Sequence, residues 1–167
     1  MHVETERFGT LEITPEAIIE VPQGLYGFEH AKRFCLIDHD GSNSFRWLQC
    51  LDVPALAFVV INPYDFFTNY QVELEDQEAT AIELRQPQDA IILNLVTLGN
   101  SPEETTANLV GPIVLNAKNR KAKQVVLANQ AYTTKHRLLP ENSGARPPHV
   151  AARPAPAVAV AADDLAT

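Results

Sequence analysis

The chain has 167 residues, a length typical of one domain, and is 46% hydrophobic and 20% charged, which suits a globular core. Its net charge of −8 disfavours a general nucleic-acid binder, because such proteins gain affinity mainly from Lys and Arg on phosphates. No apolar run approaches the roughly 20 residues of a membrane-spanning helix. Acids stand near the start, where a signal peptide is basic. We therefore expect a cytoplasmic protein without a membrane segment.

Residues 1–138 are predicted to be mainly β, because short apolar runs alternate with turn-forming residues. This spacing predicts one domain, a small antiparallel β-barrel or sandwich. The expected strands are residues 3–8, 11–13, 17–21, 34–37, 45–51, 57–61, 90–98, 113–115 and 124–128.

One short helix is predicted at residues 75–85. Acidic residues occupy its first turn and Arg85 its last, which matches the helix dipole, and Pro87 follows as a stop. Cys35 and Cys50 each lie inside an apolar run, and the cytosol keeps thiols reduced. We expect both cysteines to be buried free thiols.

The composition changes near Leu139. Residues 139–167 contain no aromatic residue, nine alanines and five of the twelve prolines. Such a segment cannot bury enough apolar area to offset its ordering entropy, so it is predicted to be a disordered C-terminal tail. A tethering or recognition arm is the functional alternative.

Basic residues gather late in the chain. Residues 118–138 hold six basic and no acidic side chains, and the stretch 118–123 lies between two predicted strands. It is interpreted as a charged hairpin tip, or alternatively as a contact for phosphate or an acidic partner. A β-barrel that binds single-stranded RNA and acts directly on transcripts is therefore kept as an alternative function.

The loop after residues 58–61 is unusually aromatic. Five of the chain's twelve aromatic residues fall in residues 58–70. Pro63 ends the expected strand because proline has no N–H for a sheet. Loops normally face water with polar residues, so this one either plugs an end of the core or offers a surface to a partner.

Sequence motifs for catalysis are absent. The chain has no Gly-x-Ser-x-Gly elbow, no Walker loop and no Gly-x-Gly-x-x-Gly, and its five histidines lack metal-ligand spacing. We expect a protein that is not an enzyme and that needs no cofactor or metal.

Four sequence blocks, in order, resemble the family of the flagellar assembly factor FliW. They cover nearly all of residues 1–138. They are residues 7–13 (RFGTLEI), 18–28 (IIEVPQGLYGF), 45–49 (FRWLQ) through 62–67 (NPYDFF) to Tyr70, and 106–113 (TANLVGPI) with 124–127 (QVVL).

The resemblance implies a small non-enzymatic β-barrel that exchanges protein partners. Family members bind cytoplasmic flagellin and also CsrA, the small dimeric regulator that blocks translation of its target mRNAs. Once flagellin is exported, the freed factor binds CsrA beside its RNA site and relieves repression of flagellin synthesis; the family is also described as protecting flagellin before export. The resemblance also implies a monomer that makes no direct contact with nucleic acid. The acidic body suits CsrA, which must be basic to hold RNA.

Candidate partner contacts lie in the aromatic loop. Tyr70 is expected to be the exposed anchor, because it keeps a hydroxyl for a partner. One of Phe66 and Phe67 is expected to cap the core, since adjacent extended side chains face opposite ways. A turn-stabilising amide and a partner contact remain equally open for Asn108. The full set of partner-binding candidates is Asp65, Phe66, Phe67, Asn69, Tyr70, Glu73, Glu75 and Asn108.

Overall fold

The computed structural model describes residues 1–38 and 44–139. Apart from Leu139, which is buried, the predicted disordered tail lies outside the described residues. Within them the chain is mainly β with one short α-helix, which confirms the predicted fold class. The strands are β1 (His2–Thr5), β2 (Gly9–Glu12), β3 (Ile19–Glu20), β4 (Arg33–Asp38), β5 (Phe45–Cys50), β6 (Ala57–Ile61), β7 (Ala90–Thr97), β8 (Thr106–Ala107), β9 (Ile113–Asn116), β10 (Ala122–Gln124) and β11 (His136–Arg137).

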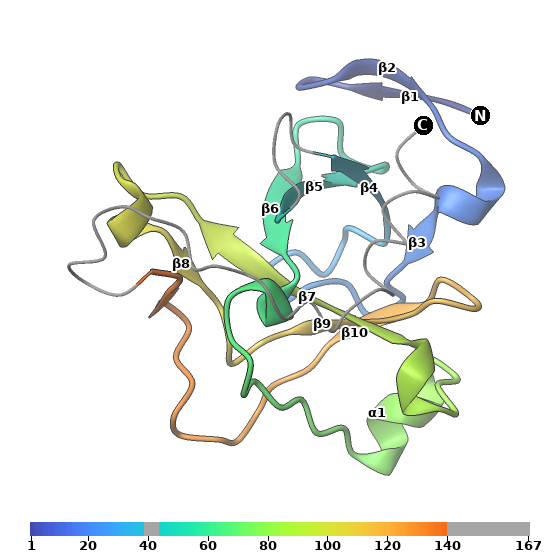
Figure 1. The fold of residues 1–167 in the computed structure, drawn as a ribbon. Coiled ribbons are helices and arrows are strands. Elements are labelled where there is room, and N and C mark those ends of the chain that lie inside the picture. Colours follow the sequence, from blue (N-terminus) through green and yellow to red (C-terminus); the bar gives the residue numbers. More distant parts are fainter. Residues whose placement is uncertain (39–43, 140–167) are drawn as a thin grey trace.

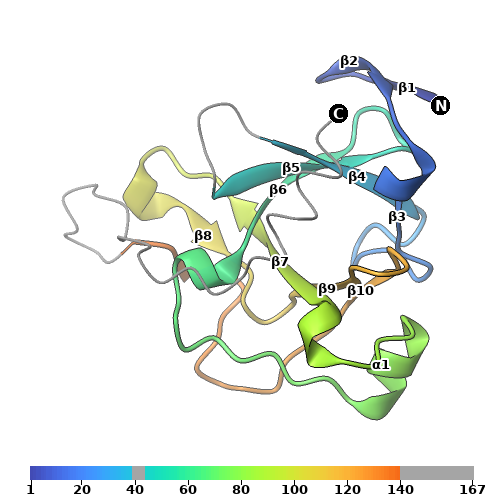
Figure 2. The ribbon, with the colours of Figure 1, turned by 45° about the vertical axis from the view of Figure 1, so that its right-hand side comes forward.

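Most strands belong to one strongly bent antiparallel sheet (Figure 1). Its order is β10-β9-β7-β6-β5-β4-β3, and β8 and β11 continue it beyond the second half of β7. The long strand β7 pairs with β9 through residues 90–93 and with β6 through residues 94–96. Strands β1 and β2 form a separate hairpin at one end of the molecule (Figures 1 and 2).

The sheet is not closed into a barrel, which corrects one form of the predicted architecture. Strand β3 meets the start of β10 at a single parallel bridge between Glu20 and Lys121. Side chains hold the rest of this seam: Gln124 Oε1 accepts from the Tyr26 N–H at 2.9 Å. Arg120 Nε donates to the Glu16 carbonyl, also at 2.9 Å. The β3–β10 seam therefore relies on side chains where a barrel would have a ladder.

The helix is shorter than predicted. Helix α1 (Asp76–Ala81) begins after Glu75, whose N–H donates to Glu78 Oε1 at 3.1 Å. It ends because Glu83 adopts a positive φ of 57°, and the Leu84 N–H donates back to the Ala79 carbonyl at 2.8 Å. This is a Schellman-type ending, usually made with glycine. Among the described residues, no helix has the length and apolar character needed to cross a bilayer.

Two apolar clusters form the core, one on each side of the bent sheet's middle strands. The larger lies around β4, β5 and the N-terminal segments, and includes both cysteines. Cys35 and Cys50 are buried free thiols, as predicted, and burial raises the pKa of Cys35 to about 11. The smaller lies between β7, β9, the aromatic loop and the chain from Val125 to Leu138.

Candidate functional site

The aromatic loop folds back onto the sheet. The Asn62 side chain accepts from the Tyr64 N–H at 3.0 Å, and Pro63 starts the 3₁₀ helix η2 (Pro63–Asp65). This turn directs Asp65 inward, where it is only 3% exposed. Phe66 and Phe67 are both half-buried against the smaller cluster, so neither side chain is fully buried in the core.

Tyr70 is buried, which corrects its predicted role as the exposed anchor. Its side chain is 4% exposed, and its hydroxyl donates to the Leu109 carbonyl at 2.6 Å. Asn94 Nδ2 donates to the same hydroxyl at 3.1 Å. Burial raises the pKa of Tyr70, as expected for a phenol whose charged form loses water. The hydroxyl that was expected to bind a partner is therefore hydrogen-bonded inside the protein.

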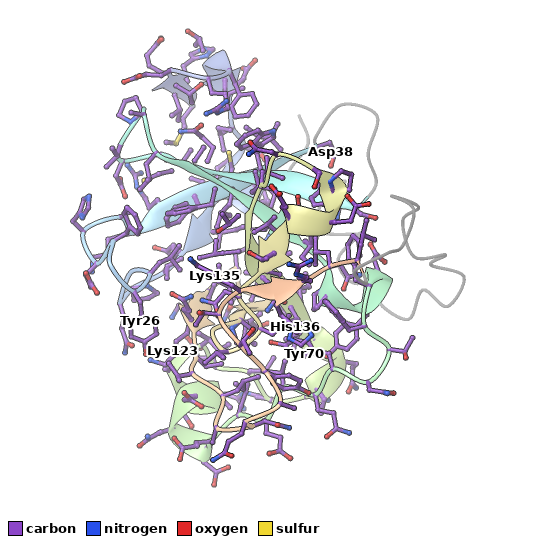
Figure 3. The ribbon with its side chains drawn as sticks, turned by 90° about the vertical axis from the view of Figure 1, so that its left-hand side faces the viewer. Tyr26, Asp38, Tyr70, Lys123, Lys135 and His136 are labelled. Carbon is purple, nitrogen blue, oxygen red and sulfur yellow. The ribbon has the colours of Figure 1, made fainter. Side chains whose placement is uncertain are left out.

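Aromatic contacts tie the loop to the C-terminal segment. The Tyr70 ring meets Tyr132 with centroids 4.8 Å apart, and Phe67 meets His136 at 5.2 Å. Figure 3 shows Tyr70 near His136, whereas Tyr26 and Lys123 lie together at another part of this view. Of the loop's candidates, Asp65 and Tyr70 are inaccessible and Asn69 is exposed. The loop mainly plugs the smaller cluster.

Asn108 acts within its own turn. Its Oδ1 accepts from the N–H groups of Val110 and Gly111 at 3.1 and 2.9 Å. Its carbonyl accepts from Asn94 Nδ2 at 2.8 Å. This is the turn-stabilising role that the sequence left open. Asn108 thereby fixes the chain between β8 and β9, against which residues 125–127 pack.

An acidic groove lies where the loop leads into α1. One wall is the segment 71–75 with the first turn of α1, the other is residues 126–129, and the volume is about 670 Å³. Glu73 and Glu75, both predicted contacts, lie on one wall with Glu78. Val126 on the other wall is 59% exposed, one of few large apolar side chains so open among the described residues. We call this the acidic groove; it is lined by Gln71, Glu73, Leu74, Glu75, Glu78, Val126, Leu127, Ala128 and Asn129.

The groove combines carboxylates with an apolar strip, and none of the described residues that line it is a cation. That arrangement suits a basic segment with apolar side chains. The structure thus brings Glu73 and Glu75 together and separates them from Asp65 and Tyr70. Sequence reasoning missed Val126; its signal was an apolar residue in the predicted strand 124–128, of which only the beginning is strand.

Basic residues 118–123 are largely engaged within the molecule. Lys118 lies 3.6 Å from Asp89, and Lys121 pairs with Glu83. Lys123 Nζ bonds Gln23 Oε1, and Arg120 bonds the Glu16 carbonyl. These contacts fit the charged hairpin tip better than a phosphate-binding surface.

A model of the FliW protein family matches residues 2–138. The chain belongs to the FliW family. The flagellar assembly factor FliW of Treponema denticola is 40% identical to this FliW-family chain over 145 residues, which are 87% of this chain and 98% of that protein. The protein of the same name from Magnetococcus marinus is 39% identical over 143 residues, 85% of this chain and 87% of that protein.

A solved structure supports the same conclusion at the level of the fold. The crystal structure of a flagellar assembly factor FliW superposes with a TM-score of 0.78 at 37% identity. The superposition covers 85% of this chain and 99% of that one. That FliW structure therefore shares the overall fold of this chain.

Proposed function

We propose that this chain is a cytoplasmic flagellar assembly factor that works by exchanging protein partners and catalyses no reaction. It binds flagellin before export. When free of flagellin, it binds CsrA and antagonises its repression of mRNA, so that flagellin synthesis resumes. Family membership supports the assembly role, and the groove supports a protein partner.

The observation that carries the proposal is the acidic groove. CsrA must be basic to bind RNA, and Glu73, Glu75 and Glu78 offer a field of the opposite sign beside the exposed Val126. Binding of CsrA in the groove also brings the acidic surface of this chain close to the RNA site of CsrA. The negative charge of that surface repels RNA phosphates. The groove is therefore assigned as the CsrA contact, with flagellin binding excluding CsrA.

Calorimetry with purified cognate CsrA tests the groove. The double variant Glu73→Lys and Glu75→Lys is expected to weaken binding at least tenfold, about 1.4 kcal/mol, because two attractions become repulsions. The control is Glu6→Lys with Glu16→Lys, which makes the same change of net charge at exposed carboxylates outside the groove. If both double variants weaken CsrA binding equally, the loss reflects the net charge of the chain. That outcome would reject the groove as the CsrA contact.

Competition tests the exchange itself. Titrating flagellin into the preformed complex with CsrA is expected to displace CsrA stoichiometrically. A stable ternary complex would contradict mutually exclusive binding. Absence of heat with both cognate partners would overturn the proposed function altogether.

A further inference from the structure

The wall of the acidic groove formed by residues 126–129 continues the edge of the sheet. The Val125 N–H donates to the Pro112 carbonyl at 3.0 Å, and the Leu127 N–H donates to the Val110 carbonyl at 2.7 Å. Strand β10 pairs with β9 in the same register, Gln124 opposite Ile113. Residues 125–127 are thus an extension of β10 along the chain that precedes β9.

In an extended chain, the backbone N–H and C=O groups of successive residues point to opposite sides of the strand. If Val125 and Leu127 bond inward, the N–H and C=O groups of Val126 and Ala128 point outward, away from the β9 side. None of the hydrogen bonds among the described residues involves these groups. Before this point the outer side is covered, by the Glu20–Lys121 bridge and the Tyr26–Gln124 bond. Within the described part of the chain, the edge at Val126 and beyond has no such cover.

This open edge faces the groove. Val126, Leu127 and Ala128 line one wall, and the acidic segment carrying Glu73 and Glu75 lines the other. Figures 1 and 2 both show the two segments passing close to each other below the sheet. Unpaired strand edges are templates for another strand, and natural proteins usually guard them with charge or cover. Here the carboxylates of Glu73 and Glu75 lie on the wall opposite the edge.

We propose that a protein partner enters the groove as an extended segment and adds to this edge as a further strand, hydrogen-bonded to Val126 and Ala128. Basic side chains of the segment face Glu73 and Glu75, and an apolar side chain packs on Val126. A segment alternating Lys or Arg with apolar residues has the required period of two. This mode of binding rests on the proposed function, since it supposes that the groove holds a protein partner.

A helix in the groove would be a different mode. Its backbone groups bond internally, so it would leave the outward N–H groups of Val126 and Ala128 exposed to water. Strand addition uses those groups directly. The two modes therefore differ in the hydrogen-exchange rates of the Val126 and Ala128 amides, which only strand addition slows by hydrogen bonding.

Amide hydrogen exchange of the full-length ¹⁵N-labelled chain, alone and with saturating CsrA, tests strand addition. The Val126 and Ala128 amides are expected to exchange rapidly alone and at least about tenfold more slowly in the complex. The Leu127 amide, already bonded to Val110, serves as the internal reference. Binding that leaves Val126 and Ala128 exchanging freely overturns strand addition and leaves the proposed function standing. Absence of binding overturns both.

Two variants at one position add an independent test. Val126→Pro removes the outward N–H, and Val126→Thr keeps it with a side chain of similar shape. Strand addition predicts that the proline variant loses at least tenfold in affinity for CsrA while the threonine variant stays within about threefold. Far-ultraviolet circular dichroism checks that both are folded. A folded proline variant with unchanged affinity overturns the proposal.

Discussion

Replacing Tyr70 by phenylalanine isolates the internal role of its hydroxyl. The substitution removes one donor and one acceptor from a buried site and leaves the ring contact with Tyr132 in place. The Leu109 carbonyl and one N–H of Asn94 then lose their partner. A buried polar group left unpaired costs about 1–3 kcal/mol, so we expect a loss of about 2 kcal/mol in the free energy of unfolding.

Urea denaturation followed by tryptophan fluorescence measures this loss. The midpoint falls and the slope stays constant, because the surface exposed on unfolding is unchanged. In thermal unfolding the same loss corresponds to a decrease of about 4–8 °C in Tm for a domain of this size. Tyr132→Phe is the matched control. Among residues 1–38 and 44–139, the one hydrogen bond of its hydroxyl is accepted from the exposed Gln71 N–H, so the cost is below about 1 kcal/mol.

The Tyr70→Phe variant also separates the effect of the hydroxyl on stability from any effect on CsrA binding. Because Tyr70 is buried, folded Tyr70→Phe is expected to bind CsrA as tightly as the wild type. A loss of stability below about 0.5 kcal/mol would refute the hydrogen-bond reasoning. A tenfold loss of CsrA affinity in the folded variant would restore Tyr70 as a contact residue.

Three further predictions concern other parts of the fold. Gly24→Ala is expected to cost roughly 2–4 kcal/mol in urea denaturation, because φ is +71° and a Cβ would lie 2.5 Å from the backbone of Glu29. Gly27→Ala, with φ of +87° and open space, costs only about 1 kcal/mol. Folding holds the pKa of Cys35 at about 11, above its unfolded value of 9.0; stability is therefore retained below pH 9 and lost towards pH 11. Wild type should lose about 2–3 kcal/mol more than Cys35→Ala over that interval, and equal losses would contradict it. Arg7→Ala, which removes a cation 4.4 Å from the ring of the single tryptophan, should red-shift its emission; an unchanged spectrum would contradict this.

Strand positions could be predicted from the sequence because they depend on local alternation. The run 34–37 lies within β4 and the run 57–61 coincides with β6. The end of α1 could not be predicted in this way. Its Schellman ending places Glu83, an ordinary helix former, at a position where glycine is the usual signal.

The candidate site was half accessible to sequence reasoning. Glu73 and Glu75 were predicted as partner contacts from their position beside the aromatic loop; the structure places both in the lining of the acidic groove, and their contact with a partner stays a prediction. The burial of Tyr70 could not be predicted, because its hydroxyl was expected to meet a partner and instead donates to the Leu109 carbonyl, 39 residues further along the chain. Val126 acquires its importance only from a segment some fifty residues earlier that forms the opposite wall.

The β3–β10 seam also bears on the kinetics of folding. Most of the sheet is a meander in which consecutive strands pair, so its contacts form across short loops. The seam joins residues 98 to 104 positions apart, a closure that costs about 4 kcal/mol of chain entropy by logarithmic scaling. We expect such contacts to form after the main barrier, so that weakening them accelerates unfolding and hardly slows folding. The bonds of Gln124 and Arg120 should therefore govern the lifetime of the folded state more than the speed of its formation.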